Sequence, residues 1–356
     1  HRGFDHMELA NHFFEGHSHY DRWMNNHAAA KEKFFPMLNG KGQNTASTGE
    51  TGAPQVWPMD VPSELYHTQW VADRTRSWLE SQSDNQPWFC WMSFPDPHHP
   101  WDVPKSELHR IDWRDVTLPQ IYSENQATVE AWLDQKPGHW RGYYDGTQWT
   151  NLESPRGFKP RDMTADQIRE INAMTHIENE LIDEACAQVF ELLGTRGWLG
   201  NTDIFFTTDH GELQGDFGLM FKGPYHVDAL MRLPFIWRPA PDLGIPAGEV
   251  SSPVGHVDLA ATFCEIAEIP APDYSEGTPL PLHETDGNNR ECVLTEWDSE
   301  HGPANVHMRS VYHRDGVLCT TYGPGSHHDG SEGELYNMRE DPLQLRNLWH
   351  DSSMRS

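Results

Sequence analysis

The chain has 356 residues, of which 37% are hydrophobic and 15 are tryptophan, so it can bury one large core or two smaller ones. Its 54 acidic and 26 basic side chains give a formal net charge of -28, which would repel a nucleic acid partner. No run of about 18 apolar residues is present to span a bilayer. The five cysteines are scattered without C-x-x-C spacing, which indicates neither a disulfide framework nor a cysteine zinc site.

The first third of the chain predicts a helix followed by a strand. Apolar residues recur at helical spacing over residues 61–81, after Pro62 and Ser63, which suit a helix start. Residues 87–94 form a short, almost unbroken apolar run, which is typical of a buried strand in a parallel sheet. A loop containing two adjacent histidines, His98 and His99, follows this predicted strand.

The middle of the chain begins with an irregular segment. Residues 101–160 are rich in Trp, Tyr, Pro and Gly with weak periodicity, which favours a surface insertion or lid. Its aromatic side chains could contact a substrate, for example as a cation-π surface, but packing is the more economical interpretation. From Thr164 to Gly194 a strong helical pattern predicts a long packed helix. A buried strand is predicted over residues 203–208.

The last third changes character after residue 269. A short strand at 234–237 and an apolar helix at 256–269 complete the predicted α/β core. Beyond them, residues 293–297, 308–313 and 317–322 predict short strands of a small antiparallel subdomain, followed by a terminal Glu-Leu-Tyr segment.

Side chains of the metal-binding type follow two of the predicted core strands. In open α/β sheets ligands bind beyond the carboxyl ends of the strands, where His98 and the Asp209–His210 pair are expected. Asp209 and His210, followed by Gly211 at a tight turn, can bring a carboxylate oxygen and an imidazole nitrogen to one divalent cation. For an isolated Asp-His pair, the alternative is a capping aspartate beside a surface histidine.

A longer motif surrounds this pair. It runs from residue 207 to residue 224 and reads TTDHGELQGDFGLMFKGP, which closely resembles the signature that sulfatases carry after a core strand. The resemblance extends to the segments 2–5, 94–100, 232–236, 257–262 and 333–337. It implies a formylglycine-dependent sulfatase similar to arylsulfatases and choline sulfatases, with the α/β fold of the alkaline phosphatase superfamily. That fold is a mostly parallel sheet sandwiched by helices, here expected at residues 1–280, with an antiparallel α+β subdomain at 281–356.

Position by position, the resemblance implies roles for four residues. Asp209 and His210 match metal ligands, normally for Ca²⁺, with Mn²⁺ or Zn²⁺ as alternatives. Lys222 matches the lysine that binds a sulfate oxygen and supports the leaving group. His98 matches the histidine that contacts the sulfate and protonates the leaving alcohol.

Other residues near the motif are secondary candidates. His226 and Arg232 follow the lysine loop and are predicted to face the substrate pocket, while Glu212 is a candidate for contact with the metal ligands. Asp216 is interpreted as a turn residue between two glycines, and His99 as an ordinary loop histidine.

The nucleophile expected from the resemblance is missing from these residues. Sulfatases need a Cys or Ser in a Cys/Ser-X-Pro-X-Arg motif that is converted to formylglycine, and none of the five cysteines lies in such a motif. The paired aspartates that complete the metal site are also missing. The sequence is therefore interpreted as an N-terminally truncated fragment of a sulfuric ester hydrolase.

Two other functions remain open from the sequence. One is a phosphonate monoester hydrolase or phosphodiesterase of the same superfamily, which places similar groups around phosphorus. The other is a catalytically dead relative that only binds a ligand. The expected partner is a small-molecule or carbohydrate sulfate ester. Its identity, the oligomeric state and the compartment cannot be read, although the cysteine pattern favours the cytoplasm over the periplasm.

Overall fold

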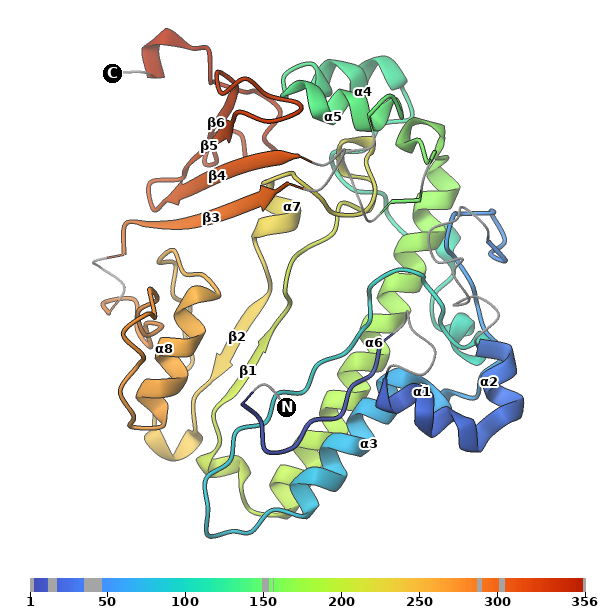
Figure 1. The fold of residues 1–356 in the computed structure, drawn as a ribbon, viewed down its shortest axis with the longest axis vertical. Helices are drawn as coiled ribbons and strands as arrows, with labels where there is room; N and C mark the ends of the chain where they lie inside the picture. Colours follow the sequence, from blue (N-terminus) through green and yellow to red (C-terminus); the bar gives the residue numbers. More distant parts are fainter. Residues whose placement is uncertain are drawn as a thin grey trace. The chain divides into compact units, whose positions relative to one another are not determined.

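The computed structural model describes residues 3–11, 18–34, 47–148, 154–155, 157–286, 290–300 and 305–354 (Figure 1). The chain forms two compact units. The first comprises His1–Gln120, Glu153–Phe158 and Asp162–Thr202, and the second comprises Ile121–Leu152, Lys159–Arg161 and Asp203–Ser356. Within the described residues, no helix is long and apolar enough to cross a membrane.

The first unit is helical. It contains α1 (His19–Met24), α2 (Ala28–Phe34), α3 (His67–Glu80) and α6 (Ala165–Thr195), and α3 packs along α6 (Figure 1). The sequence predicted α6 almost to the residue. Its N-terminus is fixed by a capping box, in which the backbone N–H of Gln167 donates to Thr164 Oγ1 at 3.2 Å and the Gln167 side chain accepts from the Thr164 N–H at 3.0 Å.

The structure corrects the prediction of a buried strand at residues 87–94. They are extended, but the described structure assigns them to no strand. Their side chains alternate in exposure, because successive residues of an extended chain point to opposite sides. Met92 and Phe94 pack against the core, whereas Trp91 is 64% exposed. A continuous apolar run therefore does not signify burial on both faces here.

The second unit carries the strands. β1 (Ile204–Thr207) and β2 (Phe235–Arg238) pair with each other in antiparallel register, so that Phe206 lies opposite Ile236. These two strands run in opposite directions because the intervening loop and α7 (Asp228–Met231) turn the chain back. Phe205 packs edge-on against Phe263 of α8 (Val257–Ile266), with ring centroids 5.0 Å apart. The opposite face of β1 leaves Phe206 exposed, so this predicted buried strand is only half-buried, on one face.

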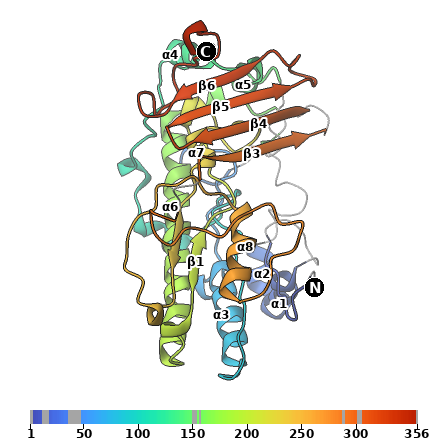
Figure 2. The ribbon, with the colours of Figure 1, turned by 90° about the vertical axis from the view of Figure 1, so that its left-hand side faces the viewer.

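The C-terminal strands confirm the predicted antiparallel sheet. β3 (Cys292–Ser299), β4 (Val306–His313), β5 (Val317–Gly323) and β6 (Gly333–Asn337) lie side by side in chain order (Figure 2). Val306, Met308 and Tyr322 form a small core on one face. The predicted Glu-Leu-Tyr segment lies within β6.

The part of the predicted lid that belongs to the second unit is packed rather than open. It contains α4 (Gln126–Leu133) and α5 (Gly138–Tyr144), and Trp140 and Tyr143 of α5 are buried. The buried ammonium of Lys136 lies 4.9 Å from the centre of the Trp140 ring and 4.4 Å from that of Tyr336. It also donates a 2.7 Å hydrogen bond to the Tyr336 hydroxyl. The chain's own lysine thus occupies this aromatic cage.

Candidate active site

The turn after β1 presents the Asp209–His210 pair. Its geometry is set by short-range hydrogen bonds: the His210 N–H donates to Asp209 Oδ1 at 2.9 Å, and the Thr208 hydroxyl donates to the His210 carbonyl at 3.0 Å. The Asp209 side chain is 85% exposed, and its Oδ2 lies 3.6 Å from His210 Nε2. A carboxylate oxygen and an imidazole nitrogen therefore lie side by side at the end of a strand.

A backbone contact selects the ring nitrogen of His210 that is available to a metal. Nδ1 donates a 2.8 Å hydrogen bond to the Gly211 carbonyl, so Nδ1 carries the proton in the neutral ring. Nε2, the atom nearer Asp209, then holds the lone pair. A hydrogen bond from the distal nitrogen is the usual way in which proteins orient a metal-binding histidine. The pair therefore fits a divalent cation, although calcium would need several more oxygen ligands.

The loop that follows brings Lys222 back toward this turn. The Leu213 N–H donates to the Phe221 carbonyl at 3.2 Å, and the Gly215 N–H donates to the Leu219 carbonyl at 2.8 Å. These bonds fold the segment into a hairpin-like loop, so the backbone of Lys222 lies beside the segment that starts at His210. The Lys222 side chain is partly buried.

The secondary candidates have different surroundings. His226 is buried, and its Nδ1 lies 2.6 Å from the Ser310 hydroxyl of β4; burial lowers its pKa to about 4. Arg232 is 81% exposed and pairs with Asp228 at 3.0 Å. Glu212 is partly buried, directly after Gly211.

Asp216 lies at a tight turn, in a short 3-10 helix that runs from Asp216 to Gly218, where the next residue, Phe217, has a φ of 56°. The placement agrees with the predicted turn role. Burial raises the pKa of Asp216 to about 6, and the charge of Asp228 contributes in the same direction.

His98 belongs to the first unit. Its Nδ1 donates to the carbonyl of the next residue, His99, so in the neutral ring Nε2 holds the lone pair. The two rings stack with centroids 4.2 Å apart. His99 is buried rather than an exposed loop residue, because its ring also packs toward Trp101. His98 and the pair Asp209–His210 therefore lie in different units of the chain.

The loop that carries His98 continues into a short paired segment. The Trp57 N–H donates to the Trp101 carbonyl at 2.8 Å, and the Met59 N–H donates to the Val103 carbonyl at 2.9 Å. These bonds pair residues 101–104 with residues 56–59 in parallel. Asp102 is thereby held in the interior of the first unit, where it is 1% exposed.

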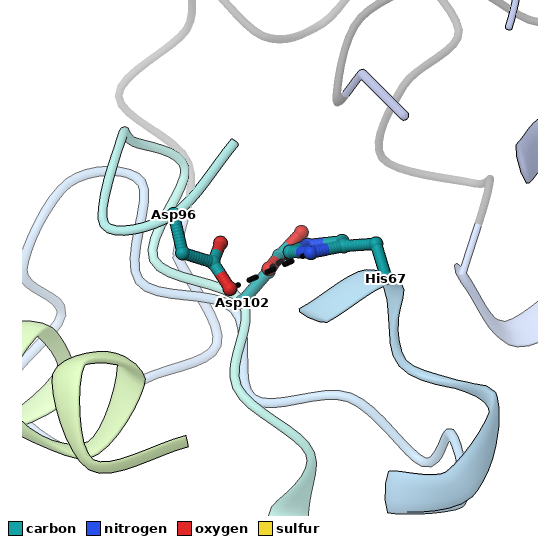
Figure 3. Close-up of side chains that lie close together, drawn as sticks. All are labelled: His67, Asp96 and Asp102. Atoms are coloured by element: carbon teal, nitrogen blue, oxygen red, sulfur yellow. Dashed lines mark ion pairs between the residues drawn. The ribbon is translucent and has the colours of Figure 1, made fainter. Parts of the chain in front are cut away.

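A buried cluster beside this loop was missed from the sequence (Figure 3). His67, the first residue of α3, lies with its Nδ1 3.4 Å from Asp96 and its Nε2 3.7 Å from Asp102. All three side chains are buried, and their ligand atoms lie within 4.8 Å of one another. Asp96 lay inside a recognised motif, but nothing local in the sequence marks His67 or Asp102 as its neighbours.

Cys90 and Cys186 do not resemble activated nucleophiles. Burial raises the pKa of the Cys90 thiol to about 11, and that of the Cys186 thiol to about 11, where the charge of Asp183 adds to the effect of burial. Thiolates, rather than thiols, attack electrophiles, so these side chains are poor nucleophiles at neutral pH.

Comparison with known proteins assigns the chain to a family. The sequence model of the Sulfatase family matches residues 11–269. The chain is 27% identical over 297 residues to the uncharacterized sulfatase YidJ of Escherichia coli, covering 79% of this chain and 51% of that protein. It is 27% identical over 297 residues to an arylsulfatase of Clostridium perfringens, covering 82% of this chain and 55% of that protein.

Solved structures give the same fold. A phosphonate monoester hydrolase of Agrobacterium radiobacter matches with a TM-score of 0.73 at 18% identity, over 96% of this chain and 67% of that one. A structure of BT4656, in complex with its substrate D-glucosamine-2-N,6-O-disulfate, matches with a TM-score of 0.61 at 18% identity, over 81% of this chain and 66% of that one.

The chain belongs to the sulfatase family, and its fold is the α/β fold of alkaline-phosphatase-like hydrolases. Members of this family generally bind a divalent metal. The chain spans about half the length of the curated relatives it matches first.

Proposed function

We propose that the protein containing this chain is a sulfuric ester hydrolase that converts a sulfate monoester to an alcohol and sulfate. The observation that carries the proposal is the turn at the end of β1, where Asp209 and the Nε2 atom of His210 lie side by side. Membership in the sulfatase family supports the assignment of this turn to the reaction centre.

Asp209 and His210 would hold a divalent cation, and Ca²⁺ is the ion we propose. The resemblance of residues 207–224 to the sulfatase signature supports this choice of ion, whereas the imidazole of His210 taken alone would suit Mn²⁺ or Zn²⁺ better. When bound, such a cation would supply positive charge against the oxygens of the sulfate group.

Lys222 and His98 would act on the substrate itself. The Lys222 ammonium is a compact positive charge suited to a sulfate oxygen, and the fold of its loop toward residue 213 supports a place near the metal ligands. His98, with its Nδ1 fixed by a backbone carbonyl, would protonate the leaving alcohol through Nε2. The nucleophile proposed for the whole protein is a formylglycine, whose Cys/Ser-X-Pro-X-Arg motif these 356 residues do not contain.

The proposed substrate is a small-molecule or carbohydrate sulfate ester. An N-acetylglucosamine-6-O-sulfatase of Bacteroides thetaiotaomicron, 28% identical over 366 residues, supports the carbohydrate choice; the match covers 88% of this chain and 63% of that protein.

The test compares two substrates on the whole protein. We expect turnover of an aryl sulfate to exceed that of the matching aryl phosphonate monoester, because the chain belongs to the sulfatase family. A reversed preference would identify a phosphonate monoester hydrolase instead. Binding of both compounds without turnover of either would identify a non-catalytic relative.

A further inference from the structure

We propose that His67, Asp96 and Asp102 form a binding site for a divalent first-row transition metal. None of these residues belongs to the metal ligands proposed above. The inference does not depend on the hydrolase activity, since it rests on the geometry of the first unit alone.

The spacing of the three side chains suits a common ion. Two ligand atoms that each lie about 2.1 Å from one metal are separated by about 3 to 4 Å at ordinary coordination angles. The imidazole nitrogens of His67 lie 3.4 Å from Asp96 and 3.7 Å from Asp102. These two distances involve opposite ring nitrogens, and one imidazole offers a metal only one of them. With one ligand atom taken from each of the three residues, all three atoms lie within 4.8 Å of one another, which is close to the spacing of ligands around one metal.

Hydrogen bonds from neighbouring side chains hold both carboxylates in place, as is usual for metal ligands. Thr68 donates a 2.6 Å hydrogen bond to Asp96 Oδ2, and the Tyr66 hydroxyl donates a 3.0 Å bond to Asp102 Oδ1. Such outer contacts fix the orientation of metal-binding carboxylates. Both donors sit at the start of α3, Thr68 within it and Tyr66 directly before it, so the helix that supplies His67 also positions both aspartates.

Glu178 of α6 is the second, independent observation. It is fully buried, and neither carboxylate oxygen has a hydrogen-bond partner of good geometry among the described residues. A buried carboxylate is costly unless it is paired or binds a metal. The charges of Asp96 and Asp102 act on Glu178, so a cation in this part of the first unit would offset the cost of burying all three.

The donor set narrows the choice of ion. One imidazole with two carboxylates favours Mn²⁺ or Zn²⁺ over Ca²⁺, which prefers an all-oxygen shell. The ion would join the start of α3 to the loop that contains Asp96, two residues before His98. Its structural effect would be to fix this loop.

The first experiment measures metal content without any assay of activity. The whole protein with Asp209→Ala and His210→Ala, which removes the other proposed ligands, is stripped with EDTA, loaded with Mn²⁺, dialysed and analysed by mass spectrometry of the metal. We expect about one Mn²⁺ per chain. In the same background, His67→Gln should reduce occupancy at least tenfold, whereas His109→Gln, at an exposed histidine of the first unit, should not. Failure of the background protein to retain Mn²⁺ overturns the proposal.

The second experiment uses the unsubstituted protein, because His67 is buried and its replacement can disturb folding. Circular dichroism checks each variant, and crystals loaded with Mn²⁺ are measured at an anomalous wavelength. We expect an anomalous peak between His67, Asp96 and Asp102. Density for an imidazole lying directly between two carboxylates, with no anomalous peak there, would establish a metal-free ion pair and overturn the proposal.

Discussion

Gly211 and Ala229 approach so closely that a Cβ at position 211 would lie 1.8 Å from the Ala229 carbonyl oxygen. The Gly211 N–H also donates to the Leu230 carbonyl at 3.0 Å, so α7 holds the turn that carries Asp209 and His210. We therefore predict that Gly211→Ala shifts this turn and destabilises the fold by about 2 kcal/mol, as expected for overpacking. Gly138→Ala, where a Cβ meets nothing within 4 Å, is the control and should change the free energy of unfolding by less than about 1 kcal/mol. Urea unfolding measures both; equal effects would contradict the proposed constraint.

Lys222→Ala should lower kcat of the whole protein by about 100-fold to 1000-fold, the usual cost of removing one group that stabilises developing negative charge. Turnover of an aryl sulfate measures the effect. Lys105→Ala is the matched control, because Lys105 is an exposed lysine that pairs with Asp60 at the surface. If the two variants kept the same kcat, Lys222 would have no role in the reaction.

Lys136→Met should destabilise the protein by about 3 to 5 kcal/mol, because it leaves the buried carboxylate of Glu334, 3.5 Å away, without its cation. The double variant Lys136→Met, Glu334→Gln should recover much of this loss. Arg309→Met removes the exposed pair with Glu296 and should cost less than about 1 kcal/mol. Guanidinium unfolding of the parent, Lys136→Met, Glu334→Gln, the double variant and Arg309→Met tests the prediction, and additive losses of the two single variants in the double variant would refute the coupling.

The buried imidazole of His226 predicts a loss of stability in acid. Its pKa is lowered to about 4 by burial, whereas an unfolded histidine has a pKa of about 6.5. The unfolded chain therefore binds the extra proton between these values. The stabilising contribution is complete above about pH 6.5 and is lost as the pH falls toward 4, by at most about 3 kcal/mol.

The measurement is the free energy of unfolding at pH 7.5 and pH 4.5 for the parent and for His226→Gln. We expect a smaller loss in the variant. His283→Gln, at an exposed histidine of the same unit, should behave like the parent. Asp216, whose pKa is raised to about 6, acts in the opposite direction, but it is present in all three proteins and cancels in the comparison. Equal losses in all three would show that His226 does not titrate as predicted.

Local sequence patterns predicted the helices and strands whose formation depends mainly on their own residues. The 3.6-residue periodicity after Thr164 located α6, and alternating residues located the strands β3, β4 and β5. Residues 87–94 show the limit of such reasoning, because an apolar run does not state which faces are covered. The antiparallel pairing of β1 with β2 could not be predicted either, because the sequence of a strand does not fix the direction of its neighbour.

In the candidate site, too, the residues that lie in motifs were predicted, whereas those brought together by packing were not. Asp209, His210 and Lys222 were selected through the long motif of residues 207–224 and His98 through the segment 94–100, and the roles of all four remain predictions. The Nδ1–H of His210 depends on the position of one backbone carbonyl, which no motif specifies. The cluster of His67, Asp96 and Asp102 escaped notice because its members are brought together by the packing of α3 against a loop, not by spacing along the chain.

The aromatic cage around Lys136 also has a consequence for synthesis of the protein. Lys136 bonds to Tyr336, 200 residues further along the chain, and to the carbonyl of Gln344, 208 residues further along. At roughly 5 to 20 residues per second, the ribosome needs about 10 to 40 s to make that interval. Throughout this time Lys136 lacks its contacts with Tyr336 and Gln344. The second unit must therefore complete its interior late, and its nascent chain is a natural client for chaperones that cover exposed aromatic surface.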